Sequence, residues 1–163
     1  MIRLIDLEVY KLALVIGEKV WEIVDKWDHF NKDTLEKQFV RAADSIALNI
    51  AEGYGRFFYK ENKNFNYYSR GWAFECTSIL RKASQRNLIS VEENKEIRVL
   101  FEKYFRLING YIKSIGETKT GNIVNDDVVD YNTKISTSSL DNLLFNDQLT
   151  NDNWQIILQH SWK

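Results

Sequence analysis

Basic and aromatic residues alternate between positions 56 and 70 of this chain. The cations of this stretch, with the tyrosine beside them, are Arg56, Tyr59, Lys60, Lys63 and Arg70. Cations attract phosphate groups and aromatic rings stack on nucleobases, so this composition is typical of surfaces that bind nucleic acid. The alternative is that Phe65, Tyr68 and Trp72 belong to a core, and that Lys60 and Lys63 are ordinary solvent-exposed residues at the start of a helix.

A second set of polar residues falls on one stripe of the preceding segment. At about 100° per residue, a helix brings four of them together and places Arg56 at their end. The four are Arg41, Ser45, Asn49 and Glu52. Ser and Asn weaken a helix unless their polar groups are used, so the stripe indicates a subunit interface. The alternative is a solvated face on which Glu52 and Arg56 form an i,i+4 ion pair.

Residues that could catalyse a reaction are few and scattered. Cys76 is the only cysteine, and the two histidines are His29 and His160. Cys76 lies on an apolar stripe, where a buried, inert thiol is the usual outcome. The sequence contains no phosphate-binding Gly-rich loop, no His-Glu-x-x-His motif and no nucleophile elbow. We therefore predict no catalytic residues, no metal site and no cofactor.

Four amphipathic segments must position these residues. The first helix is predicted over 6–28, because apolar residues recur there at steps of three and four. Its expected buried stripe is Leu7, Tyr10, Leu14, Gly17, Trp21 and Val24. The second helix is predicted to begin at Asp33, with Glu36 completing a capping box, and to close at Gly53 and Gly55. Its expected buried stripe is Leu35, Phe39, Ala42, Ile46 and Ile50.

The other two segments complete a bundle. The third stripe is Phe65, Tyr68, Trp72, Cys76, Ile79 and Ala83, and the fourth is Ile97, Phe101, Tyr104, Ile108, Tyr111 and Ile115. The fourth helix is entered through a capping box that starts at Ser90, and it ends at Gly116. Four helices of about 20 residues with short connections predict an all-α, up-down-up-down four-helix bundle over 1–116.

The pattern stops after Gly116. Residues 121–163 hold two lysines against six aspartates, whereas the whole chain has a net charge of only -1. We expect a polar, acidic tail over 117–163, with a disordered linker over 117–139. The apolar segments 140–145 and 154–162 are expected to order only against a partner or the bundle.

Composition narrows the class of protein further. The chain has 163 residues, is 44% hydrophobic and contains no proline. No apolar run approaches the roughly 20 residues of a membrane-spanning helix, and acidic residues interrupt the start where a signal peptide needs an apolar stretch. These features predict a cytoplasmic protein with one helical domain.

A family resemblance rests on residues 38–56, which read QFVRAADSIALNIAEGYGR, and on Glu61, Phe65 and 71–75 further along. This run resembles the bacterial four-helix-bundle family named after proteins encoded in intervening sequences of 23S rRNA genes. That family also includes the accessory variability determinant of diversity-generating retroelements. The resemblance covers about residues 5–116.

The resemblance implies a ring of five bundles without enzymatic activity. In the retroelement branch it also implies a basic surface that binds nucleic acid and a reverse transcriptase. The stripe from Arg41 to Arg56 would then hold the family's signature polar positions, with structural or intersubunit roles. This chain has Phe58 where the family tends to have a Ser cap, and Trp72 where the family tends to have a small hydroxyl residue after Gly71.

Three functional hypotheses follow. The first is a non-enzymatic homopentameric accessory protein that binds RNA or DNA together with a reverse transcriptase or another ribonucleoprotein partner. The second is a protein-assembly scaffold without nucleic-acid contact, with the tail as its docking peptide. The third, a small-molecule-binding or catalytic bundle, lacks the paired Glu-x-x-His ligands of metal bundles.

Overall fold

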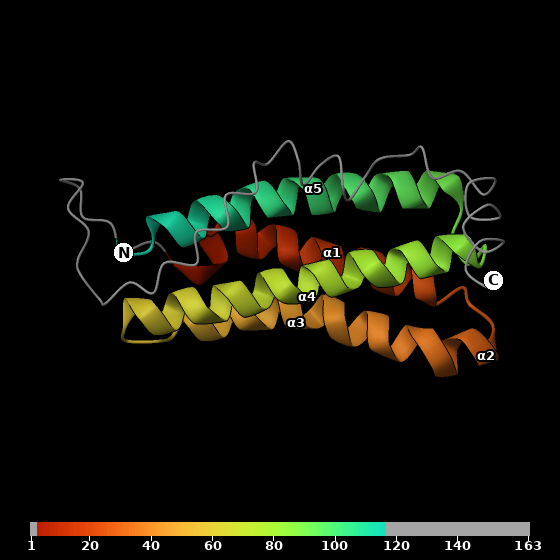
Figure 1. Ribbon diagram of the computed structural model, residues 1–163, viewed down its shortest axis with the longest axis horizontal. Helices are drawn as coiled ribbons and strands as arrows, with labels where there is room; N and C mark the ends of the chain where they lie inside the picture. Colours follow the sequence, from red (N-terminus) through yellow and green to blue (C-terminus); the bar gives the residue numbers. More distant parts are fainter. Residues whose placement is uncertain (1–2, 117–163) are drawn as a thin grey trace, which may run out of the picture. The chain divides into compact units, whose positions relative to one another are not determined.

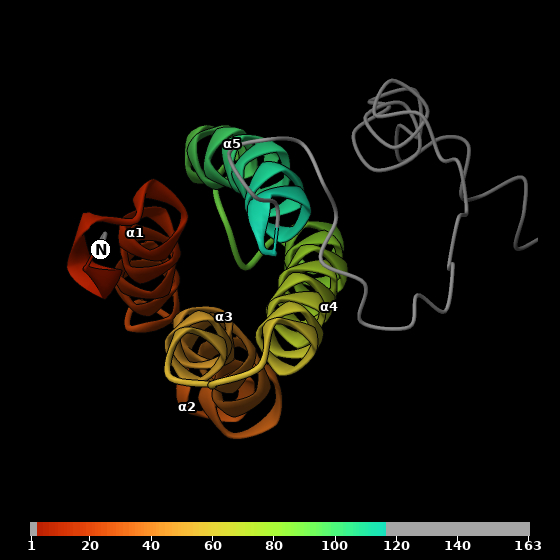
Figure 2. The same cartoon turned by 90° about the vertical axis from the view of Figure 1, so that its left-hand side faces the viewer.

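Four long helices arranged in a ring make up the described part of the chain. The structure is a computed structural model, and it describes residues 3–116. After a 3₁₀ turn (Leu4–Asp6) the elements are α1 (Glu8–Val24), α2 (His29–Asn31), a π-helical turn (Lys32–Glu36), α3 (Lys37–Tyr54), α4 (Tyr59–Gln85) and α5 (Val91–Ser114). Each long helix runs antiparallel to the next, and α5 closes the ring against α1 (Figures 1 and 2). The predicted four-helix bundle is confirmed, and the predicted tail lies outside the described residues.

The core follows the predicted stripes most closely on α3 and α5. Every predicted core residue of the second stripe is buried, from Leu35 to Ile50, and in the fourth stripe only Tyr111 stays half-exposed. The Ser90 hydroxyl accepts from the Glu93 backbone N–H at 3.1 Å, and the Glu93 carboxylate accepts from the Ser90 N–H at 3.1 Å. The predicted capping box of α5 is therefore confirmed.

The predicted buried stripe of the first helix is wrong at Leu14 and Trp21, although Val24 is buried as predicted, and the helix is shorter than predicted. Leu14 is 47% exposed and Trp21 is 54% exposed, and α1 ends at Val24. The buried residues of α1 are Val9, Leu12, Ala13, Ile16, Val20, Ile23 and Val24. Apolar residues cover more than half of this helix, so two stripes with steps of three and four compete, and the one facing both α3 and α5 is buried.

The predicted start of the second helix is also wrong. The Asp28 carboxylate caps the chain five residues earlier, by accepting from the Asn31 N–H at 3.0 Å. The Asp33 carboxylate instead pairs with the Lys37 ammonium at 2.5 Å, one turn along the same helix. One Glu36 carboxylate oxygen is buried without a hydrogen-bond partner. An i,i+3 Asp–Glu spacing is a weak signal for a capping box unless the end of the preceding loop is known. The sequence analysis therefore missed Asp28 as the capping residue.

The predicted stripe of α4 is correct in its second half only. Cys76, Ile79 and Ala83 are buried, but Tyr68 is 58% exposed. Two polar residues, Asn66 and Ser69, are fully buried in the first half instead. The Ser69 hydroxyl donates to the Ile46 carbonyl and the Asn66 amide donates to the Asn62 carbonyl, whereas the buried Asn66 side-chain oxygen has no hydrogen-bond donor among the described residues.

The α3–α4 turn and the end of α5 lie at the same end of the bundle (Figure 1). Helix α5 ends at Ser114, two residues before the predicted end at Gly116, and Gly116 has a φ of +80°, a left-handed conformation that glycine adopts readily. A Cβ built on Gly116 would lie 3.5 Å from the Tyr59 Cβ. The start of α4 therefore lies beside the end of α5.

Candidate functional site

Three of the predicted nucleic-acid-binding residues share one face of α4. At about 100° per residue, Lys60, Lys63 and Arg70 fall within about 80° of one another. Within residues 3–116, neither lysine forms an ion pair or a side-chain hydrogen bond. Their positive charges are therefore available to a ligand.

Tyr67 adds an aromatic ring to this face. The Arg70 guanidinium lies over the Tyr67 ring, with its Cζ atom 5.1 Å from the ring centroid. The same guanidinium donates to the Asn109 side-chain carbonyl on α5 at 2.8 Å. Arg70 is thus held in place between the two helices, beside a ring that is 44% exposed. Proteins that bind single-stranded nucleic acid combine cations with exposed aromatic rings in this way.

The face continues onto α5 through two residues that the sequence analysis missed. Arg106 and Lys113 are exposed, and they lie three residues before and four residues after Asn109. This spacing puts them on one stripe with Asn109, next to α4. Glu102, one turn before Arg106, offsets part of their charge. The spacing alone could have revealed them. We call Lys60, Lys63, Tyr67, Arg70, Arg106 and Lys113 the α4–α5 cationic face.

Of the other two predicted nucleic-acid-binding residues, Arg56 lies apart from that face and Tyr59 lies at its end. The Arg56 guanidinium pairs with Glu52 and lies over the Phe65 ring, 4.7 Å from its centroid. Phe65 and Lys63 are two residues apart, about 200° around α4, so Arg56 is on another side of the helix. Tyr59, at the first turn of α4, lies beside Gly116. Its ring is 54% exposed at one end of the cationic face.

The predicted interface stripe on α3 bonds largely to itself. The Ser45 hydroxyl donates to the Arg41 carbonyl at 2.7 Å, and the Asn49 amide donates to the Ser45 carbonyl at 2.7 Å. Glu52 pairs with Arg56. The short polar side chains are therefore satisfied without a partner chain. Phe58 makes no side-chain cap at the start of α4, as expected for a phenylalanine at that position.

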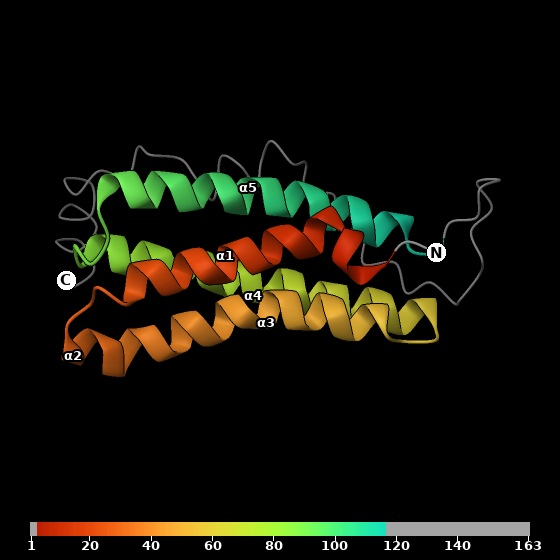
Figure 3. The ribbon, with the colours of Figure 1, turned by 180° about the vertical axis from the view of Figure 1, so that it is seen from behind.

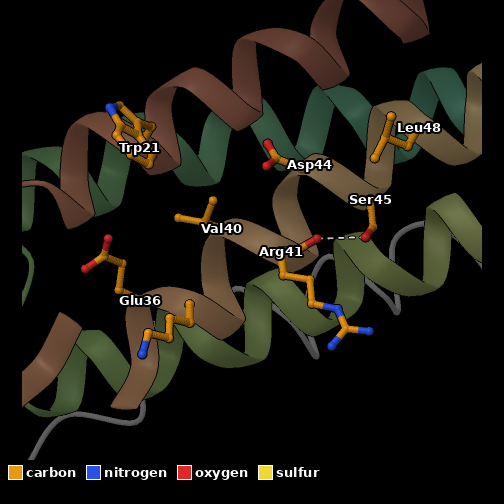
Figure 4. A pocket seen from close by; sticks show the side chains of 8 residues that line it. Trp21, Glu36, Val40, Arg41, Asp44, Ser45 and Leu48 are labelled. Atoms are coloured by element: carbon orange, nitrogen blue, oxygen red, sulfur yellow. Dashed lines mark hydrogen bonds between the residues drawn. The ribbon is translucent and has the colours of Figure 1, made fainter. Parts of the chain in front are cut away.

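Helices α1 and α3 lie side by side (Figure 3), and residues of both line a groove (Figure 4). It has a volume of about 530 Å³ and is lined by Trp21, Glu36, Lys37, Val40, Arg41, Asp44, Ser45 and Leu48. Leu48 is 65% exposed. The Arg41 guanidinium points away from the Glu36 and Asp44 carboxylates (Figure 4). The groove therefore combines exposed apolar side chains with two carboxylates and two cations, and its Lys37 ammonium pairs with Asp33.

Cys76 does not belong to either surface. Its thiol is fully buried, and burial raises its pKa far above the ordinary value, so it is not a ready nucleophile. Among residues 3–116, no three His, Cys, Asp or Glu side chains come close enough to hold a metal ion. No helix in the described range is long and apolar enough to cross a membrane.

Fold and site together define an antiparallel four-helix bundle with a cationic, aromatic face along its last two helices. Residues 5–110 match the model of the family described as 23S rRNA-intervening sequence protein. The chain therefore belongs to that family, in agreement with the resemblance that the sequence predicts.

A solved structure has the same fold. It is the 1.70 Å crystal structure of a protein of unknown function from the S23 ribosomal protein family of Bacteroides thetaiotaomicron. The two chains are 21% identical, with a TM-score of 0.51, and the match covers 63% of this chain and 99% of that chain. No curated protein matches the chain.

Proposed function

We propose that this protein is a non-enzymatic, self-associating accessory protein that binds single-stranded RNA or DNA. The observation that carries the proposal is the α4–α5 cationic face. There, free lysine ammonium groups lie along the same helix face as Tyr67, and Arg70 is already fixed between two helices. Phosphates would meet the cations and a base would stack on the exposed ring.

The low net charge of the chain makes self-association part of the proposal. A single bundle offers only about five cations on this face, so several copies acting together would bind a nucleic acid far more strongly. The stripe from Arg41 to Glu52 is our candidate subunit interface, in the ring of five that the family resemblance implies. A reverse transcriptase or another ribonucleoprotein protein is the partner class that the same resemblance implies.

Fluorescence anisotropy with a labelled single-stranded RNA tests the nucleic-acid role. Replacing both Arg106 and Lys113 by Ser should weaken binding at low salt by at least about tenfold, because two phosphate contacts are lost. The matched control replaces Lys82 and Lys103, two exposed lysines outside the face, and should change affinity by less than about threefold. Equal losses in both variants would mean that the face is not the binding surface.

Light scattering tests self-association independently. The wild-type protein should have several times the monomer mass of 19.3 kDa at micromolar concentration. Asn49→Arg should lower that mass, because a long charged side chain would stand in the proposed interface. A monomeric wild-type protein would exclude the ring.

The groove on α1 and α3 favours the second candidate function, a scaffold that assembles proteins. Exposed Trp21 and Leu48 side chains next to charged groups are typical of protein-binding surfaces. The groove and the cationic face involve different helices, but the groove shares Arg41 and Ser45 with the candidate subunit interface. A protein partner in the groove would therefore compete with formation of the ring.

A further inference from the structure

We infer that the α4–α5 cationic face continues past Arg70 to Arg81 and Lys95, so that each bundle binds an unpaired nucleic-acid strand along the whole length of these two helices. The inference rests on the proposed function and deepens it, because it adds a second group of cations to the same surface. We call Arg81 and Lys95 the distal cations.

The distal cations lie on the same stripes as the cations of that face. On α4, Arg81 follows Lys63 by 18 residues, which is five complete turns, so the two side chains leave the helix in the same direction. On α5, Lys95 precedes Arg106 by 11 residues, about three turns, and lies within about 20° of it around the axis. Both distal cations are exposed, and neither forms an ion pair or a side-chain hydrogen bond within residues 3–116.

Acidic residues lie away from the α4 stripe. Glu61 and Glu75 are the acidic residues of α4, and each lies about 120° or more around the helix from Lys63. On α5, Glu102 lies on the stripe and is half-buried. The positive charge of the surface therefore comes mainly from α4, where it is not interrupted.

An aromatic pair separates the distal cations from the rest of the face. The Phe74 ring on α4 and the Phe105 ring on α5 pack against each other across the two helices, with their centroids 4.6 Å apart and their planes at 32°. Both side chains are half-buried. Phe74 lies on the α4 stripe, one turn after Arg70 and two turns before Arg81. A base can stack on this pair while its neighbouring phosphates meet cations on either side.

Ser84 and Asn94 bring α5 beside α4 at the level of the distal cations. The Asn94 amide donates to the Ser84 hydroxyl at 3.3 Å. Arg81 is three residues before Ser84, and Lys95 directly follows Asn94. The distal cations thus lie on neighbouring helices, within about one turn of a common contact. They are at the opposite end of the bundle from the α3–α4 turn (Figure 1).

The length of the surface sets the size of the ligand. From Lys60 to Arg81, α4 rises about 32 Å at 1.5 Å per residue. A stacked strand advances about 3.4 Å per phosphate, so about ten nucleotides cover this distance. Stacking on Tyr67 and on the aromatic pair needs bases whose faces are free, and a duplex does not offer them. The ligand of one bundle is therefore an unpaired strand of about ten nucleotides.

The test uses the full chain, freed of nucleic acid, and two labelled oligouridine strands, one of about four nucleotides and one of about ten. Replacing both distal cations by Ser should weaken binding of the long strand by at least about tenfold at low salt. It should weaken binding of the short strand by no more than about twofold, because that strand can still occupy the other end of the face.

The matched control replaces Lys82 and Lys103 by Ser. Lys82 is next to Arg81 in the sequence but lies about 100° from it around α4, and Lys103 lies about 80° from Lys95 around α5. The control should change the affinity for either strand by less than about threefold.

Fluorescence of an adenine analogue in the middle of the long strand tests the aromatic pair. Stacking quenches such an analogue, so Phe74→Leu should reduce the quenching, because the ring is lost while an apolar side chain stays. The salt dependence of binding should be unchanged, since no cation is removed. Phe30→Leu, which replaces a 73% exposed phenylalanine on α2, is the matched control and should leave the quenching as in the wild type.

Three results would overturn the inference. They are equal losses of affinity in the distal and control variants, equal losses for the short and the long strand in the distal variant, and tighter binding of a duplex than of the single strand of the same length. In each case, RNA binding that still depends on Lys60 and Lys63 would leave the proposed function intact. No binding of either strand by the wild-type protein would refute both. Circular dichroism of each variant checks that the bundle remains folded.

Discussion

The Ser69 hydroxyl oxygen on α4 lies 2.7 Å from the Tyr104 hydroxyl oxygen on α5, and both side chains are fully buried. Ser69 donates its proton to the Ile46 carbonyl on α3 at 2.5 Å, so Tyr104 must donate to Ser69. Burial raises the pKa of the Tyr104 hydroxyl well above its ordinary value, which keeps it a donor. This chain of two hydrogen bonds connects three of the four helices and fixes the positions of the α4 and α5 surfaces.

Removal of the Ser69 hydroxyl should leave the buried Tyr104 hydroxyl without a partner. Ser69→Ala should therefore lower the free energy of unfolding by about 1–3 kcal/mol, and Tyr104→Phe by about 1 kcal/mol. The double variant should cost less than the sum, because no unpaired hydroxyl remains. Urea unfolding of the four proteins measures this. Strict additivity would show that the two hydroxyls are not coupled.

Gly53 allows α3 and α4 to approach closely. A Cβ at this position would lie 3.0 Å from the Asn62 carbonyl oxygen and 3.0 Å from the Phe65 Cβ. Gly53→Ala should thus destabilise the bundle by about 1–3 kcal/mol through overpacking. Gly71→Ala is the matched control, because nothing lies within 4 Å of a Cβ there. It should stabilise α4 by about 0.5–1 kcal/mol, and thermal melting should show shifts of opposite sign.

The Glu93 carboxylate should make stability depend on pH. The Lys26 ammonium at 2.6 Å, together with the Ser90 N–H and hydroxyl, lowers the pKa of Glu93 from 4.5 to about 2. A lowered pKa means stability that is present above pH 4.5 and is lost as the pH falls towards 2.

Comparison of wild type with Glu93→Gln isolates this carboxylate. The difference in unfolding free energy between the two should be largest above pH 5 and should shrink as the pH approaches 2. Glu92→Gln, which removes the neighbouring exposed carboxylate, should show a smaller and flatter difference. A Glu93→Gln difference that is constant with pH would contradict the assigned role.

Sequence alone predicted the parts of the fold that local rules determine. The stripe from Leu35 to Ile50 and the Ser90 capping box each depend on residues within a few turns of one another. The burial of Ser69 could not be predicted in this way, because its partners are a carbonyl on α3 and a hydroxyl on α5. The α1 stripe failed because two apolar stripes fit the same spacing, and only the neighbouring helices select between them.

The candidate surfaces also have features that local sequence predicts and features that depend on residues far apart in the chain. The alternation of basic and aromatic residues singled out Lys60, Lys63 and Arg70, and α4 brings these three to one of its faces. The sequence could not show that Asn109 would bring α5 beside them, since that contact joins residues 39 positions apart. The groove was missed because Trp21 was assigned to the core, and its exposure follows from the true register of α1.

The salt dependence of RNA binding tests the central claim most directly. Each phosphate contact with a single strand contributes roughly 0.7 to the slope of log affinity against log salt. Replacing Lys60 and Lys63 together by Ser should reduce that slope by about 1.4, whereas replacing Lys82 and Lys103 should leave it unchanged. Equal slopes for the two double variants, or no RNA binding by the wild-type protein at about 50 mM salt, would contradict the α4–α5 cationic face as a nucleic-acid-binding surface.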